Sequence, residues 1–332
     1  MMPIPFSDDP VLAELRARAA RADWSGVRGL ADHPAIRADL ESEILVSEAE
    51  LRQGATVHAK VRLQWVTPEA ARRHDGPAFR RATNMLGAAH FELGELPDAE
   101  AAFERALAEA TREGDHLTAA RATNNLGMIA NMRGQHDTAL ALYRVAIPAY
   151  QQLGYPSGIG ETSHNIAITL RDLGQFDEAE RYERRAIEFA TDAGNRRLAA
   201  IARVGRADVA LKIGEAAVAA TGAQMAAAEF GELGDQFSEA DALRVVAQAQ
   251  GDLNHVAEGL RTVERVLVLA EELGATLIRA EAHRTRAELL IRKGDRAHAA
   301  EDVAASQILF GQLGATAERE RLDQWWMQAQ PR

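Results

Sequence analysis

The sequence predicts an all-α protein in which pairs of helices repeat along the chain. Three observations support this prediction. The chain overlays on itself when it is shifted by 40 residues, glycine recurs at the same places in each copy, and β-branched runs with two-residue alternation are missing. An internal period of this length is typical of a solenoid, in which each repeat packs on its neighbours and the core grows along one axis.

Composition excludes several classes of protein. Of the 332 residues only 5% are aromatic and alanine is abundant, which favours closely packed helices. The net charge of −11 argues against a nucleic-acid binder with a broad basic face. The absence of cysteine excludes disulfides, thiolate metal sites and cysteine nucleophiles, and it fits a reducing compartment. With no signal peptide at the start and no apolar run near the ~20 residues that span a bilayer, we expect a soluble, cytoplasmic protein with no membrane partner.

The first 34 residues do not follow the 40-residue register. Residues 1–10 contain three prolines and two aspartates and are predicted to form a disordered leader. Residues 11–34 are predicted to form a short N-terminal capping repeat. A terminal repeat is expected to be atypical, because its outer face meets water.

From residue 35 the register is strict, and seven repeats follow: 35–76, 78–116, 118–156, 158–196, 198–236, 238–276 and 278–316. We expect the turns at residues that tolerate the left-handed backbone region, which are glycine and, next best, asparagine. The turns inside the repeats are predicted at Gly54, Gly94, Gly134, Gly174, Gly214, Asn254 and Gly294. The second helices are predicted to end at His74, Gly114, Gly154, Gly194, Gly234, Gly274 and Gly314.

Small residues also recur on the helices. The first helices carry Ser47, Gly87, Gly127 and then alanines at the same position, so that the two helices of a repeat can approach closely. Two prolines lie inside second helices. We expect Pro68 to break its helix and Pro148 to kink its helix.

Residues 317–332 are predicted to form a C-terminal capping helix. Leu322 and one of Trp325 and Trp326 are expected to cover the open end of the last repeat. The other tryptophan has two interpretations. It belongs to a generous cap, or it forms a self-association surface through which the chain pairs as a homodimer.

These columns resemble the tetratricopeptide repeat (TPR). The best-matching residues are Leu86, Gly87, Gly94, Ala99, Phe103 and Ala106, followed by Leu126, Gly127, Gly134, Ala139, Tyr143 and Ala146. The 40-residue length is similar to the long variety in kinesin light chain, Pins-type polarity adaptors and bacterial Rap-type and maltose-activator sensors. The resemblance implies a right-handed α-α superhelix whose inner, concave wall is built from the first helices and holds the ligand.

Polar residues at the inward positions of the first helices are candidates for peptide binding. Asparagine offers a donor and an acceptor to a peptide backbone, and arginine can hold a carboxylate with two bonds. The family often places a peptide-gripping asparagine where this chain has Asn125 and Asn165. The predicted groove residues are Arg81, Asn84, Arg121, Asn124, Asn125, Asn131, His164, Asn165 and Arg171. The groove would take an acidic or C-terminal peptide segment. The alternative is a solvated helix face with hydrogen bonds between repeats.

Other kinds of site find little support. The family's clamp for chaperone tails retains only its central residue, Asn125. The ten histidines are scattered with no paired spacing on one helix face, so we expect no metal, no cofactor and no catalytic site. The predicted function is a non-catalytic scaffold that binds a protein or peptide on its concave face. The alternative is a peptide- or ligand-sensing regulator, of the bacterial TPR sensor type, that acts through a protein partner.

Overall fold

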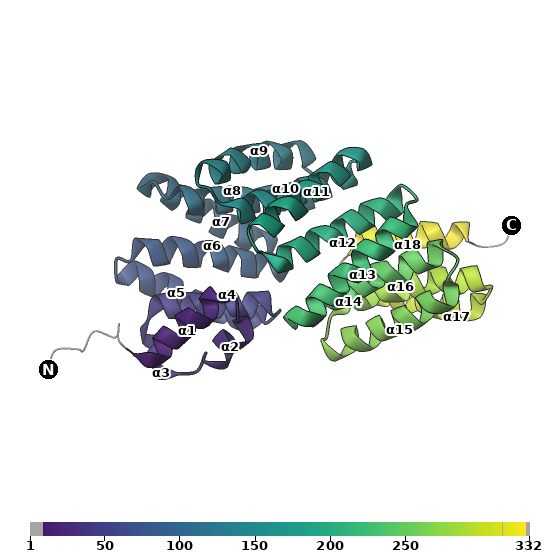
Figure 1. Cartoon of the computed structure of the whole chain (residues 1–332), viewed down its shortest axis with the longest axis horizontal. Helices are drawn as coiled ribbons and strands as arrows, with labels where there is room; N and C mark the ends of the chain where they lie inside the picture. The colour runs from purple at the N-terminus through teal and green to yellow at the C-terminus, as the bar shows by residue number, and fades with distance from the viewer. Residues whose placement is uncertain (1–8, 314, 330–332) are drawn as a thin grey trace. The chain divides into compact units, whose positions relative to one another are not determined.

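In the computed structural model, which describes residues 9–313 and 315–329, the chain is all-α and no strand occurs among these residues (Figure 1). The helices up to the middle of the chain are α1 (Pro10–Ala20), α2 (Trp24–Gly29), α3 (Pro34–Ala38), α4 (Leu40–Arg52), α5 (Thr56–Arg72), α6 (Gly76–Glu92), α7 (Leu96–Glu113), α8 (His116–Met132) and α9 (His136–Gln152). The remaining helices are α10 (Pro156–Asp172), α11 (Phe176–Asp192), α12 (Arg196–Lys212), α13 (Ala216–Leu233), α14 (Gln236–Asp252), α15 (Val256–Glu272), α16 (Thr276–Lys293), α17 (Arg296–Gln312) and α18 (Thr316–Gln328).

The chain divides into two compact units, Met1–Thr162 and Ser163–Arg332, and the boundary falls inside α10. Within each unit a helix packs on the next helix in the sequence, and the first helix of one pair also contacts the first helix of the next pair. Such contacts join α4 to α6 and α6 to α8 in the first unit, and α12 to α14 and α14 to α16 in the second. This order of packing is that of a helix-pair solenoid.

The turns adopt the predicted backbone conformation. Positive φ angles occur at all the predicted glycines among the described residues, from Gly54 (φ 71°) to Gly294 (φ 86°), and also at His74 (φ 57°) and Asn254 (φ 64°). The prediction of the two turn columns is therefore confirmed, except for Gly314, which lies outside the described residues. A left-handed residue at these positions lets the chain reverse within three residues.

The small-residue positions permit close helix contact. A Cβ atom added to Gly87 would lie 2.6 Å from the ring of Phe103, and one added to Gly127 would lie 2.5 Å from the ring of Tyr143. Phe103 and Tyr143 are buried. The aromatic ring of the second helix therefore lies against the bare backbone of the first.

The expected break at Pro68 is wrong. Helix α5 continues through Pro68 to Arg72, and α9 likewise continues past Pro148. Proline removes one backbone donor and leaves the carbonyl four residues earlier without its helical partner. Pro68 and Gln64 are both exposed, so water can satisfy that carbonyl while buried Leu63, Val66 and Ala70 hold the helix in place.

The N-terminal helices form a separate core around Leu12, Leu15, Val27 and Ile36. Of the leader predicted at 1–10, only Asp9 and Pro10 lie among the described residues. Asp9 caps α1 through a 2.8 Å bond from the Val11 amide, and Pro10 is the first residue of that helix.

The last helix, α18, covers the end of the second unit. Leu322 is buried among Phe310, Leu309 and Val303, and both Trp325 and Trp326 are partly buried against the same cluster. Their ring centroids lie 6.1 Å apart. The exposed apolar residue of this helix is Met327, with 66% of its surface accessible. Across the described part of the chain, no helix has the length and apolar character that a membrane span requires.

Candidate functional site

The predicted groove residues are distributed over both units. Six of them lie on α6 and α8 of the first unit, namely Arg81, Asn84, Arg121, Asn124, Asn125 and Asn131. The other three, His164, Asn165 and Arg171, lie on the part of α10 that belongs to the second unit.

Three asparagines of the first unit form a connected cluster, here called the asparagine cluster (Asn84, Asn124 and Asn125). The Nδ2 atom of Asn125 donates to Asn84 Oδ1 at 3.3 Å, across the contact between α8 and α6. The Nδ2 atom of Asn124 donates to Asn125 Oδ1 at 3.4 Å. Asn84 and Asn124 are buried and Asn125 is half-buried. Each amide has two N–H donors and two acceptor lone pairs, and Asn125 uses one donor and one lone pair in these two bonds.

Arg121 lies three residues before Asn124 on α8. Its Nη2 atom donates to the hydroxyl of Tyr155 at 2.9 Å, and the guanidinium carbon lies 5.3 Å from the centre of that ring. Burial by itself would lower the pKa of Arg121, but Tyr155, Tyr150 and Glu161 raise it above its ordinary value. The guanidinium is therefore a permanent positive charge that is held by an aromatic ring.

Arg81 occupies the same position in the preceding repeat but has different partners. It forms an ion pair with Glu41 and a longer one, 3.4 Å, with Glu48. Its positive charge is already matched by carboxylates of α4. Arg121, in contrast, donates to the phenol of Tyr155, and the charge of Glu161 acts on it as well.

Asn131 lies at the C-terminal end of α8 and contacts the next helix. Its Oδ1 atom lies 3.0 Å from Nδ1 of His136, so it links the end of α8 to the start of α9. This contact spans the turn at Gly134, and its effect is to stabilise that turn.

Of the predicted groove residues in the second unit, His164 and Arg171 form contacts with carboxylates. The Nδ1 atom of His164 lies 3.0 and 2.9 Å from the two carboxylate oxygens of Glu183. Arg171 lies 3.6 Å from Asp208 on α12 and 3.6 Å from its neighbour Asp172. Asn165 is half-buried, and its backbone carbonyl accepts a bond of 3.1 Å from Thr169 Oγ1.

One further cluster carries side chains that can ligate a metal, and it was not predicted from the sequence. His90, Glu95 and Asp98 place one ligand atom each within 4.8 Å of one another, across the turn between α6 and α7. The Nζ atom of Lys60 lies 2.7 and 3.0 Å from the two oxygens of Glu95. The hydrogen bonds from Lys60 are the largest cause that lowers the pKa of Glu95, and the bond from His90 is the next largest. Lys60 thus supplies the positive charge that a metal ion would bring.

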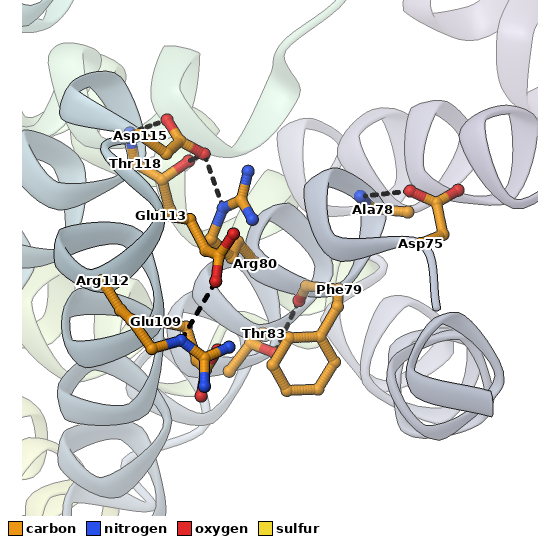
Figure 2. Close-up of polar contacts among 10 residues, drawn as sticks. All are labelled: Asp75, Ala78, Phe79, Arg80, Thr83, Glu109, Arg112, Glu113, Asp115 and Thr118. Atoms are coloured by element: carbon orange, nitrogen blue, oxygen red, sulfur yellow. Dashed lines mark hydrogen bonds and ion pairs between the residues drawn. The ribbon is translucent and has the colours of Figure 1, made fainter. Parts of the chain in front are cut away.

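Two cavities are lined by residues outside the predicted groove. One, of about 340 Å³, lies at the contact of α5, α6 and α7 and is lined by Phe79, Arg80, Glu109 and Arg112 among others. In Figure 2, Arg80 Nε donates to Asp115 at 2.9 Å and Arg112 Nε donates to Glu113 at 3.1 Å. Arg112 also donates to Glu109 at 2.6 Å. The other, of about 620 Å³, lies in the second unit beside His283, Arg286 and Asp302.

Comparisons with known proteins agree with this architecture. Family models described as tetratricopeptide repeat match residues 79–152 and 161–192. No curated protein sequence matches the chain significantly.

Similar solved structures share its fold. A Rap protein complexed with Competence and Sporulation Factor has 13% identity and a TM-score of 0.64, with 96% of each chain covered. The Rap conjugation gene regulator of plasmid pLS20, in complex with the Phr* peptide, has 17% identity and a TM-score of 0.67, with 84% of this chain and 76% of that one covered. A signal-transduction ATPase with a tetratricopeptide repeat sensor, from Pyrococcus horikoshii, has 13% identity and a TM-score of 0.59; the match covers 87% of this chain but only 45% of that protein.

Proposed function

We propose that this chain, which is a tetratricopeptide-repeat protein, is a non-catalytic scaffold that binds an extended peptide segment of a partner protein. The binding face is formed by α6 and α8, with the asparagine cluster at its centre and Arg121 beside it. The ligand segment is acidic or ends in a free carboxylate, and binding takes place in the cytoplasm.

The observation that carries this proposal is the connected asparagine cluster on two neighbouring first helices. An extended peptide presents backbone donors and acceptors at a rise of about 3.3 Å per residue. Amide side chains can form hydrogen bonds with both kinds of group, so they recognise the main chain of a peptide rather than one particular side chain. Arg121 adds one permanent charge, which suits a carboxylate.

The similar Rap structures support a peptide ligand, because both were solved with a peptide or a factor bound. They also favour the second candidate, in which the bound peptide changes how this chain contacts another protein. A plain scaffold would bind its peptide without altering other contacts. A sensor would bind a second protein with different affinity in the presence and absence of the peptide.

The test starts from a displayed library of random peptides with free C-termini, from which binders are selected and their affinities measured by calorimetry. The double substitution Arg121→Ala/Asn125→Ala should weaken a selected peptide about ten-fold or more, since a hydrogen bond to a charged group contributes about 1.5–3 kcal/mol. Amidation of the peptide C-terminus, or neutralisation of its acidic residues, should weaken binding to the wild type and much less to the double variant.

Arg144→Ala is the matched control, because Arg144 is exposed on the second helix α9. It should leave the affinity unchanged. Selected peptides that bind the double variant as tightly as the wild type would show that the ligand lies elsewhere.

Self-association through α18 is the last part of the proposal. Trp325, Trp326 and the exposed Met327 form an apolar end that a second copy of the chain could cover.

A further inference from the structure

One buried position recurs in every full repeat, and in a single repeat the residue at this position is a carboxylate. Glu183 on α11 is 1% exposed. Its equivalents at intervals of 40 residues are uncharged and also buried: Leu63, Phe103, Tyr143, Ala223, Val263 and Val303. An ionised carboxylate in such a place is costly unless a partner neutralises it.

His164 on α10 is that partner, and two further features of the sequence fit the pair. The two preceding repeats have Asn84 and Asn124 at the position of His164. At Gly205 on α12, an added Cβ atom would lie 2.2 Å from Glu183 Oε1 and 3.0 Å from His164 Cε1. The neighbouring repeats carry the larger Asn165 and Val245 at this position. Histidine, glutamate and glycine thus depart from the repeat pattern together, and their contacts join three helices.

The charges around the pair favour a protonated imidazole. Burial by itself would lower the pKa of His164, but the charge of Glu183 and the contact with it raise the pKa above its ordinary value. At longer range Arg171 on the same helix acts to lower the pKa, and Asp208 on α12 acts to raise it. A raised histidine pKa contributes stability that is complete below about pH 6.5, the pKa of the unfolded state, and that is lost as the pH rises through the folded-state value.

We propose that the His164–Glu183 pair makes the packing of α11 and α12 on the part of α10 that belongs to the second unit proton-dependent. While His164 carries its proton, the pair is neutral overall and the three helices stay packed around it. When the proton leaves, Glu183 is a buried charge without a counter-charge at hydrogen-bond distance, and the contact among the three helices weakens.

The second unit contains a matched pair that should not respond in this way. His283 and Asp302 are also 19 residues apart, and Nδ1 lies 2.7 Å from the carboxylate. Here Arg286 also donates to Asp302, from Nε at 2.8 Å and from Nη2 at 2.7 Å. Asp302 therefore has a permanent cation beside it that does not depend on His283.

The first experiment measures the histidine pKa values by NMR of the full chain with labelled histidine, between about pH 5 and 9.5. The variants H164Q and H283Q assign the two signals. His164 is expected to titrate above 6.5, and Glu183→Gln should lower its pKa by about one unit or more. A wild-type His164 that titrates at or below 6.5, or a pKa that Glu183→Gln leaves unchanged, would overturn the proposal. The wild-type measurement decides the matter even if the Glu183 variant does not fold.

The second experiment follows the midpoint of urea unfolding of the second unit's helices over the same pH range, with a probe placed in α11. The midpoint of the wild type should fall as the pH rises above 6.5. H164Q should remove most of this fall, whereas H283Q should retain it. Parallel curves for the wild type and H164Q would overturn the proposal. Peptide binding by the first unit is measured separately, so either proposal can fail alone.

Discussion

At the scale of single residues, the contact between a glycine and an aromatic ring controls how closely two helices approach. Gly127 on α8 lies against Tyr143 on α9, where an added Cβ atom would come within 2.5 Å of Cε1 and 2.8 Å of Cδ1. Real Cβ atoms do not approach a ring so closely, and Tyr143 is buried with no room to withdraw. Gly127 does not lie in a turn, since the turn is several residues away. Position 127 requires glycine because a larger side chain has no room there.

We therefore predict that Gly127→Ala lowers the free energy of unfolding by about 1–3 kcal/mol, as overpacking does in other cores. Gly222→Ala is the control, since Gly222 lies within α13 and its added Cβ would meet only ordinary contacts at 3.7 and 3.9 Å. Alanine should stabilise that helix by about 0.5–1 kcal/mol. Urea unfolding of both variants checks the two predictions. Changes of the same sign in the free energy of unfolding would refute the steric explanation.

At the scale of helices, two equivalent aspartates begin successive first helices with different partners. Asp75 caps α6 by accepting from the Ala78 amide at 3.1 Å. Asp115 caps α8 by accepting from the Thr118 amide at 3.0 Å, and it also accepts from Arg80 at 2.9 Å (Figure 2). Although burial acts to raise the pKa of Asp115, the bonds from Thr118 and Arg80 lower it below its ordinary value. One cap therefore serves its own helix, and the other also ties two repeats together.

Asp75→Ala should cost about 1 kcal/mol, the usual value for losing a cap, whereas Asp115→Ala should cost about 2–3 kcal/mol because it also leaves Arg80 unpaired. Because the pKa of Asp115 is lowered, its contribution is present above pH 3.8 and is lost as the pH falls through the folded-state value. Unfolding curves at pH 7 and pH 3 check both statements. Costs that are equal at pH 7 would show that Arg80 contributes nothing.

At the scale of the whole chain, α18 ends the second unit with an apolar surface. Leu322 is fully covered, but Trp325 and Trp326 keep part of their surface and Met327 is mostly exposed. A helix with this pattern closes the core and leaves part of its apolar surface exposed.

If the chain pairs through this surface, sedimentation of the wild type should show a concentration-dependent dimer, and Met327→Glu should shift it toward monomer. Met132→Glu is the control, because Met132 is similarly exposed on α8. A wild type that stays monomeric at all concentrations, or a dimer that resists Met327→Glu, would remove self-association from the proposed function.

Prediction from sequence succeeded where the physics is local. The turn columns depend on the φ angle of one residue, and Gly54, His74 and Asn254 all have the predicted left-handed backbone. It failed at Pro68, where the cost of a missing hydrogen bond depends on whether the carbonyl of Gln64 meets water. Exposure of one carbonyl is a property of the packed molecule, and a proline rule applied along the chain does not contain it.

For the site, the sequence indicated which helix positions are polar but not which residues they meet. Asn84 and Asn125 were chosen by position, and their hydrogen bond became visible only when α6 and α8 were packed. His90 and Glu95 form no pair on one helix face, because these two residues lie on either side of a turn, so the spacing of residues within a helix does not predict their contact.

The sequence by itself determined the helix pairs, their stride of 40 residues and their turns, because periodicity and glycine chemistry act within a few neighbouring residues. Only the tertiary structure decided that His164 meets Glu183, that Arg121 meets Tyr155 while Arg81 meets Glu41, and that Lys60 neutralises Glu95. Each of these contacts joins residues 19 to 40 positions apart, in different helices or in the turns between them, and the distance between such side chains is set by how the helices pack.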